Sequence, residues 1–194
     1  MILDVRPVYA GRVIQLSIER VQLPNGSVAE LEIVRHPGGA AIVALDDRQQ
    51  VCLLRQFRHA ADGWIYELPA GKLDNREPPL DCARRELREE AGREATEWQS
   101  LGSYLSSPGV LTEVLHLYLA RGLTAVAAAP EEHEVLEVEW VPLSQALEMA
   151  TDGRIRDGKT LVGLFLAERQ VNREPPQSRN PWQIASDRSR APIS

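Results

Sequence analysis

The stretch from Gly71 to Arg93, GKLDNREPPLDCARRELREEAGR, decides how the rest of the chain is interpreted. Its second half predicts a helix, because Pro78 and Pro79 suit a first helical turn and an apolar stripe with helical spacing follows them. The stripe consists of Leu80, Ala83, Leu87 and Ala91. Gly92 is a typical residue for a helix to end at.

Three glutamates share one edge of this expected helix. At about 100° per residue, Glu86, Glu89 and Glu90 project within roughly a quarter of the circumference, beside the apolar stripe. Like charges at this spacing repel by roughly 0.2–0.5 kcal/mol per pair unless a counter-charge is supplied. A divalent cation would supply it, and hard carboxylate oxygens select Mg²⁺ or Mn²⁺ over zinc. The alternative is a solvated acidic face paired with the arginines of the same helix.

The stretch as a whole resembles the signature of the Nudix hydrolases. That signature has a glycine, a glutamate six residues later, and then R-E-aliphatic-x-E-E-x-G followed by an aliphatic residue. Its positions are occupied here by Gly71, Glu77, Arg85, Glu86, Leu87, Glu89, Glu90 and Gly92. Seven specified residues, each with a background frequency of roughly one in fifteen, would coincide on the order of once per million sequences. The signature has an aliphatic residue where this chain has Arg93. We expect this difference to affect local packing and not the metal ligands.

The resemblance implies a phosphoanhydride hydrolase with a mixed α/β (α+β) Nudix fold. We expect a central mixed β-sheet sandwiched between helices, with a small amino-terminal antiparallel sheet. The resemblance also implies that Glu86 and Glu90 are the principal Mg²⁺ ligands, that Glu89 assists, and that Mn²⁺ can substitute. Metal ions suit this chemistry because they neutralise the diphosphate oxygens and lower the pKa of bound water.

Segments outside the signature are similar to those of the ADP-ribose pyrophosphatases, a Nudix subfamily. These segments are Arg55-Gln56-Phe57-Arg58, Glu67-Leu68-Pro69-Ala70, Ser107-Pro108-Gly109 and residues 153–160. The likeness implies that the backbone carbonyl of Ala70 is a metal ligand and that Arg58 contacts the diphosphate, since an arginine fork suits phosphate oxygens. Further candidate substrate-binding residues are Arg55, Glu67, Pro108 and Gly109. For Arg55, a role in strand-edge solubility is equally open.

The catalytic base in these relatives usually comes from an acidic loop downstream of the signature. The matching loop here is Glu131-Glu132-His133-Glu134, just before a strand-like segment. Glu134 is the best positional match and Glu132 the second choice, because a mobile loop carboxylate can close over the substrate and take a proton from water. The third candidate is Glu89, which serves as the base in some other Nudix enzymes.

The rest of the chain is rich in strand-like segments. Arg12 to Leu23 and Val28 to Val34 flank an Asn-Gly turn and predict a hairpin, and Ala40 to Leu45 with Val51 to Phe57 predict a second one. Further strands are expected at Trp64 to Leu68, Glu97 to Tyr104, Val110 to Ala120 and Val135 to Val141. Two short helices are expected at Ser144 to Asp152, capped by Ser144, and at Lys159 to Gln170.

Length and composition indicate one main globular domain in the cytoplasm. The 194 residues are 43% hydrophobic and 26% charged, close to the average for water-soluble domains. No apolar run approaches the roughly 18–20 residues of a membrane span, and the amino terminus lacks the pattern of a signal peptide. The formal net charge of −6 counts against a nucleic-acid partner. Cys52 and Cys82 have no spacing that indicates a zinc site or a disulfide framework.

We divide the chain into an amino-terminal β-rich dimerisation part (residues 1–36), a Nudix domain (37–170) and a flexible polar tail (171–194). By likeness to the subfamily, the amino-terminal part exchanges between subunits of a homodimer. The expected substrate is a small nucleoside diphosphate sugar, with ADP-ribose cleaved to AMP and ribose 5-phosphate. Alternatives are GDP-mannose or ADP-glucose as substrate and, more distantly, a non-catalytic domain that senses ADP-ribose.

Overall fold

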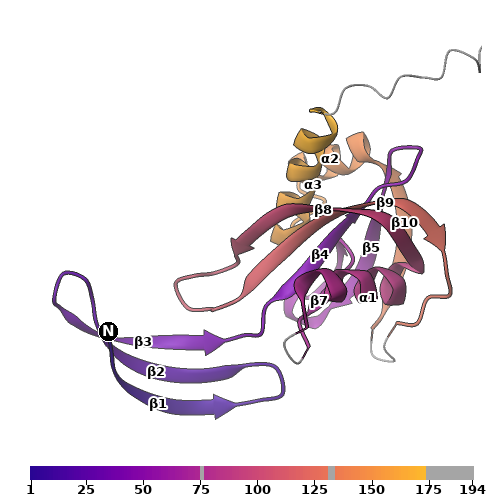
Figure 1. Ribbon diagram of the computed structural model, residues 1–194. Helices are drawn as coiled ribbons and strands as arrows, with labels where there is room; N and C mark the ends of the chain where they lie inside the picture. The colour runs from indigo at the N-terminus through magenta and orange to yellow at the C-terminus, as the bar shows by residue number, and fades with distance from the viewer. Residues whose placement is uncertain (75–76, 131–133, 174–194) are drawn as a thin grey trace, which may run out of the picture.

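The computed structural model describes residues 1–74, 77–130 and 134–173, and the fold is given for these residues. A sheet of three amino-terminal strands lies beside a larger α/β body (Figure 1). The three strands are β1 (Ile2–Ala10), β2 (Gln15–Gln22) and β3 (Val28–Arg35), antiparallel and in the order β1-β2-β3. The predicted first hairpin is confirmed by the pairing of β2 with β3, whereas β1 was not expected.

The body contains two further sheets. The first is mixed and has the order β7-β4-β9-β8, with bounds Ala70–Lys72, Gly39–Ala44, Val114–Ala125 and Arg93–Leu105. In it β4 runs parallel to β9 and antiparallel to β7. The second sheet is antiparallel and has the order β10-β5-β6, with bounds Leu136–Pro142, Gln50–Arg58 and Gly63–Glu67. A short 3₁₀ turn at His59–Ala61 joins β5 to β6.

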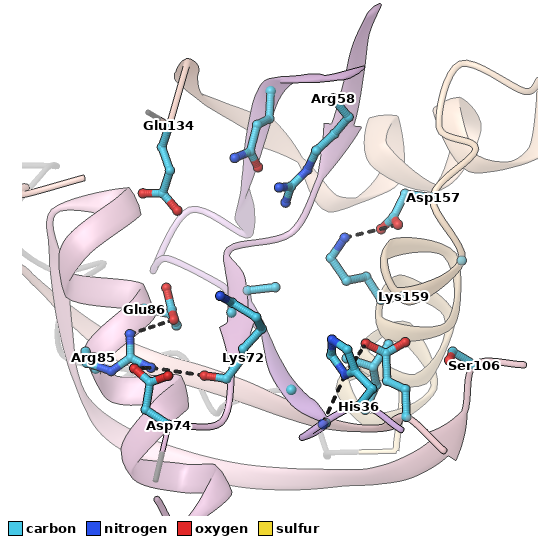
Figure 2. A pocket seen from close by; sticks show the side chains of 18 of the residues that line it. His36, Arg58, Lys72, Asp74, Arg85, Glu86, Ser106, Glu134, Asp157 and Lys159 are labelled. Atoms are coloured by element: carbon cyan, nitrogen blue, oxygen red, sulfur yellow. Dashed lines mark hydrogen bonds and ion pairs between the residues drawn. The ribbon is translucent and has the colours of Figure 1, made fainter. Parts of the chain in front are cut away.

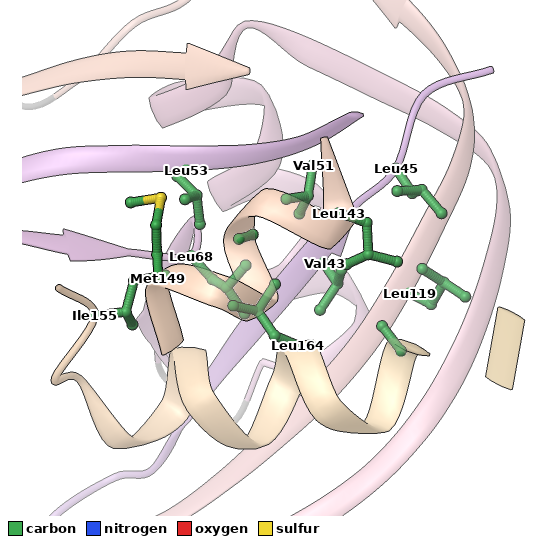
Figure 3. Close-up of a cluster of buried hydrophobic side chains, with 12 residues drawn as sticks. Val43, Leu45, Val51, Leu53, Leu68, Leu119, Leu143, Met149, Ile155 and Leu164 are labelled. Carbon is green, nitrogen blue, oxygen red and sulfur yellow. The ribbon is translucent and has the colours of Figure 1, made fainter. Parts of the chain in front are cut away.

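Helices cover the strands from two sides, as expected for the predicted fold class. Helix α1 (Pro79–Ala91) packs against β4, β7 and β8, and α3 (Gly158–Val171) packs against β4 and β9, with α2 (Leu143–Thr151) beside α3. Strand β4 divides its buried side chains between the two layers: Ile42 joins the α1 cluster, and Val43 joins the α2 and α3 cluster shown in Figure 3. This alternation is the reason for an unbroken apolar strand sequence.

Two local predictions are wrong. Strands β4 and β5 do not form a hairpin, because both edges of β4 are occupied by β7 and β9, and only the bridge between Leu45 and Val51 joins the two segments. Helix α2 is not capped by Ser144: the residue at its cap position is Pro142, and no side chain caps it. The expected helix of the signature is confirmed from Pro79 to Ala91, and Gly92 ends it in the left-handed conformation.

No helix in the described ranges combines the length and the apolar character that crossing a bilayer requires. The tail from residue 174 onward lies outside the described residues, and so does most of the acidic loop, residues 131–133. The division of the chain at residues 36 and 170 stays a prediction.

Candidate active site

One cavity of about 630 Å³ brings distant parts of the chain together. Its walls come from the beginning of β4, the end of β5, strand β7, helix α1, the β8–β9 region and the first turn of α3. Figure 2 shows Glu86 and Arg85 on one side of this cavity, Lys159 and Asp157 on the opposite side, and Arg58 and Glu134 across its upper rim. Carboxylates therefore face cationic side chains across one space.

Helix α1 presents Glu86 and Glu89 to this cavity, and Glu90 is buried beside them, outside the described cavity wall. Its apolar stripe packs against the sheet, so the adjacent edge faces β7, and Glu86 and Glu90 are buried there with 7% and 1% exposure. Gly71 on β7 makes this approach possible: a Cβ at residue 71 would lie 1.8 Å from Oε1 of Glu86. The glycine of the signature thus has a steric reason, because any side chain would displace the Glu86 carboxylate.

Arg85 joins the loop before α1 to the glutamates on the helix. Its guanidinium donates to Glu77 at 3.0 and 3.2 Å, to Glu86 at 2.6 Å and to Glu89 at 3.1 Å. It also donates to the backbone carbonyl of Lys72 at 3.2 Å. The hydrogen bond with Glu77 is the main reason why the pKa of Arg85 is raised and that of Glu77 is lowered. Arg85 is therefore a fixed counter-charge.

Arg85 does not fully offset the cost of burying the carboxylates of Glu86 and Glu90. Burial is the main cause that raises the pKa of Glu86 to about 7, and the charges of Glu89 and Glu134 add to it. Burial also raises the pKa of Glu90 to about 8, although Glu90 accepts the N–H of Ala70 at 2.8 Å. Glu134 contributes to both shifts, so its carboxylate lies within electrostatic range of both helix glutamates.

The residues at this edge fit a hard divalent cation. Every atom that could coordinate such a cation is an oxygen. These oxygens belong to the carboxylates of Glu86, Glu89 and Glu90 and to the backbone of Ala70, which lines the cavity. Within the described ranges, no three acidic, His or Cys side chains already surround one point, since Glu86 and Glu89 are hydrogen-bonded to Arg85. The fit rests on charge. A bound cation would attract both carboxylates and so offset the lost hydration and the mutual repulsion that raise their pKa values.

Arg58, on β5, faces the edge of α1 that carries Glu86. Its Nε and Nη2 donate to the two carboxylate oxygens of Glu67, at 2.7 and 3.0 Å. Burial opposes the ionisation of Glu67, but the hydrogen bond from Arg58 and the charge of Lys159 still hold its pKa below the ordinary value. Glu67 is 2% exposed and is absent from the described cavity lining, so it lies behind Arg58 and not in the cavity wall.

The other predicted site residues divide between the cavity and its surroundings. Glu134 lines the cavity, whereas Glu132 lies outside the described residues. Arg55 pairs with Glu137 at 3.1 Å, and its guanidinium lies 4.9 Å from the centroid of the Trp64 ring. Arg55, Pro108 and Gly109 are not part of the cavity wall that the described residues form. Their roles as substrate-binding residues stay predictions.

Sequence reasoning missed several residues of the cavity wall. They are His36, Lys72, Ser106, Glu113, Asp157 and Lys159. No local pattern marks them, because they come from five separate segments that meet only in the folded chain. The segment with Asp157 and Lys159 did show a resemblance to the subfamily, and that was the one available signal.

Arg93, the departure from the signature, has a packing role. Its guanidinium lies 5.3 Å from the centroid of the Trp140 ring and donates to the carbonyl of Gly92 at 3.0 Å. A cation over an indole face is a favourable contact that an aliphatic residue could not make. Arg93 thus packs against Trp140 on β10, and it makes no hydrogen bond or ion pair with the signature glutamates in the described part of the chain.

Comparison with known families agrees with this site. The family model described as the NUDIX domain matches residues 35–164, which include the signature and most of the cavity wall. The chain belongs to the Nudix family.

Individual relatives extend over most of the chain. An ADP-ribose pyrophosphatase from Bacillus subtilis (strain 168) and a methanol dehydrogenase activator from Bacillus methanolicus are each 38% identical over 159 residues, covering 81% of this chain and 86% of theirs. A GDP-mannose pyrophosphatase from Klebsiella pneumoniae is 40% identical over 151 residues, covering 69% and 76%. The crystal structure of an ADP compounds hydrolase has the same fold, with a TM-score of 0.77 at 21% identity, covering 89% and 94%.

Mg²⁺ should raise the melting temperature of the wild type, and Glu90→Gln should remove that shift. Because the pKa of Glu90 is raised from 4.5 to about 8, the metal-free protein loses stability as pH rises through this range. At pH 7.5 the folded metal-free protein keeps the Glu90 carboxyl largely protonated, which has a free-energy cost relative to the unfolded chain, and Glu90→Gln removes this cost while its amide oxygen still accepts the Ala70 N–H. The metal-free variant should therefore melt roughly 3–6 °C above the metal-free wild type.

The measurement is differential scanning calorimetry with excess Mg²⁺ and with chelator. Glu97→Gln, at an exposed position of β8, is the matched control and should keep the wild-type response. A full Mg²⁺ shift in Glu90→Gln would exclude Glu90 as a ligand.

Proposed function

We propose that this protein is a Mg²⁺-dependent pyrophosphatase that hydrolyses ADP-ribose to AMP and ribose 5-phosphate. The observation that supports this most directly is the cavity of about 630 Å³, which is lined by Glu86 on α1 and by Arg58 on β5, with Glu90 buried one helical turn from Glu86. A diphosphate needs cations on both sides, a metal on one and a guanidinium on the other. The relative named ADP-ribose pyrophosphatase supports the choice of substrate.

In this proposal Glu86, Glu90 and the Ala70 carbonyl hold the metal, with Glu89 in support. When bound, the metal supplies charge neutralisation and a lowered pKa of water. Arg58 binds a diphosphate oxygen. The oxygen of water forms the new bond to phosphorus, the bridging phosphorus–oxygen bond breaks, and the leaving phosphate keeps the bridging oxygen.

Glu134 is the proposed general base and takes the proton of that water on its carboxylate. It is supported by its position in the cavity wall and by its effect on the pKa of both metal-binding glutamates. In Figure 2 its carboxylate points into the cavity from above Glu86. Glu132 and Glu89 are the alternatives for the same role.

A second nucleotide sugar is the alternative substrate, because the relatives include a GDP-mannose pyrophosphatase. The metal-binding edge and Arg58 would act identically on GDP-mannose or ADP-glucose, since all three substrates share a diphosphate. A non-catalytic sensor of ADP-ribose is the more distant alternative, and the complete set of signature glutamates speaks against it.

We also propose a homodimer assembled through residues 1–36. All nine residues of β1 are exposed, and its apolar side chains include Ile2, Val5, Val8 and Tyr9 at 47–58% exposure. An edge strand with this much apolar surface favours coverage by another chain. Both cysteines are buried free thiols, a state that suits a reducing compartment, and we propose a cytoplasmic location.

Wild type and Glu90→Gln should differ sharply on a panel of ADP-ribose, ADP-glucose, GDP-mannose, NADH and a capped RNA. We expect the kcat/KM of ADP-ribose to exceed the others by about tenfold or more, and Glu90→Gln to lose roughly 100-fold. Glu97→Gln serves again as the control. Binding of ADP-ribose without turnover of any compound would contradict the hydrolase and favour the sensor.

Glu134→Gln should lower kcat by roughly 100-fold or more while KM changes less than about threefold, because a base acts in the transition state and not in substrate binding. The measurement is the initial rate against ADP-ribose concentration. Glu137→Gln, on the neighbouring strand β10 and paired with Arg55, is the control. If Glu134→Gln keeps its kcat and Glu89→Gln loses it, the base is Glu89.

Light scattering coupled to gel filtration should give the wild type twice the 21.6 kDa of one chain. Val5→Asp should convert it to the monomer, because it places a charge among the exposed apolar side chains of β1. Phe165→Asp on α3 changes a residue of similar exposure, 45% against 47%, and should leave the dimer intact. A monomeric wild type would refute the dimer, and a dimeric Val5→Asp would refute the role of β1.

A further inference from the structure

The first turn of α3 is joined to Arg58 through the buried carboxylate of Glu67. Lys159, the second residue of α3, donates its ammonium to Oε2 of Glu67, the same oxygen that accepts from Nη2 of Arg58. Residues 67 and 159 are separated by 92 positions in the chain. Glu67 thus receives two cations from different elements, and only one of them was expected to contact a diphosphate.

Lys159 is itself fixed. Its ammonium lies 3.0 Å from Oδ1 of Asp157, and its side chain is 15% exposed. Figure 2 marks this ion pair with a dashed line. Asp157 in turn caps α3 by accepting the N–H of Thr160 at 3.0 Å and the hydroxyl of Thr160 at 2.6 Å. A short chain of contacts therefore runs from the helix cap through Lys159 and Glu67 to Arg58.

Helix α3, which carries Lys159 in its first turn, is anchored to the same segment as Glu67. The hydroxyl oxygen of Thr160, which is fully buried, accepts the N–H of Leu68 at 2.8 Å. Leu164 and Leu68 pack in one core cluster (Figure 3). The backbone of Lys159 is therefore held rigidly relative to Glu67. Because of this, the Lys159 side chain can orient the Glu67 carboxylate.

The geometry of the guanidinium explains why this orientation matters. Glu67 occupies the edge of Arg58 formed by Nε and one N–H of Nη2. The other edge, formed by Nη1 and the second N–H of Nη2, has no partner among the described residues and can bind a second fork-like partner. An arginine whose rotamer is fixed beforehand loses less freedom when it binds a ligand. The Arg58 side chain is 42% exposed, so packing alone restrains it little. Its orientation therefore depends on the orientation of Glu67.

We propose that Lys159 is a positioning residue that holds Glu67, and through it the Arg58 guanidinium, in the orientation that receives the substrate diphosphate. This inference rests on the proposed function for its kinetic consequence. Lys159 also lines the cavity, but its ammonium already has two carboxylate partners, Glu67 and Asp157. In this proposal Lys159 acts on the arginine through Glu67 and does not contact the diphosphate.

The kinetic test compares Lys159→Met, which keeps the length of the side chain without its charge, with Lys159→Arg. Lys159→Met should raise the KM for ADP-ribose roughly tenfold while kcat changes less than about twofold, and Lys159→Arg should recover part of the loss. A fall in kcat with unchanged KM, or no recovery in Lys159→Arg, would overturn the proposal.

A double-mutant cycle with Glu67→Gln separates positioning from direct contact. If Lys159 acts through Glu67, adding Lys159→Met to Glu67→Gln changes kcat/KM by less than about twofold. Lys72→Met is the matched control: Lys72 also lines the cavity without an ion pair to Glu67 among the described residues, so its effect should multiply with that of Glu67→Gln. Equal effects of Lys159→Met in both backgrounds would show direct substrate contact and overturn the proposal.

A measurement without substrate keeps this inference separate from the proposed function. In ¹H–¹⁵N spectra of the full chain, the Nε–H of Arg58, assigned by its absence in Arg58→Lys, should exchange slowly with water in the wild type. In Lys159→Met it should exchange at least about tenfold faster, because Glu67 is no longer held. An unchanged signal would refute the positioning role, whereas a wild type that hydrolyses no nucleotide sugar would refute only the proposed function.

Discussion

The burial of two carboxylates on one face of α1 is the constraint on which the site depends. Glu86 and Glu90 lie one helical turn apart under the edge of β7, and each is removed from water that would otherwise stabilise its charge. Such burial is tolerated only with partners close by. The structure supplies Arg85 to Glu86 and the N–H of Ala70 to Glu90, and still leaves both pKa values high. A site of this kind is built for a cation.

Holding the helix in that place requires contacts on both of its sides. The apolar stripe with Leu87 at its centre packs into the sheet, and Arg85 ties the preceding loop to the helix through Glu77 and the Lys72 carbonyl. Gly71 completes the arrangement by removing the one side chain that would push Glu86 away. The signature residues are therefore spaced as they are because each satisfies a different physical demand of the same buried charges.

The features that could be predicted from the sequence are those determined by residues that lie close together in the chain. Helix α1, its stop at Gly92 and the shared edge of the three glutamates follow from spacing alone. The hairpin predicted between β4 and β5 failed because strand pairing is decided by which edges are already occupied, and β9, which occupies one edge of β4, comes some seventy residues later in sequence. The contact between Glu67 and Lys159 has the same character, since it depends on how α3 docks.

Charge distribution explains how an acidic chain can recognise an anion. With a net charge of −6, the field far from the molecule repels a diphosphate, so attraction must arise within the cavity over distances shorter than the Debye length of about 8–10 Å. Arg58 meets that need only if its charge is directed inward. Glu67 neutralises part of it and would by itself weaken the attraction. Lys159 shares that carboxylate and is itself paired with Asp157, so these four groups together carry no net charge, and the attraction depends on the direction in which the N–H groups of Arg58 point.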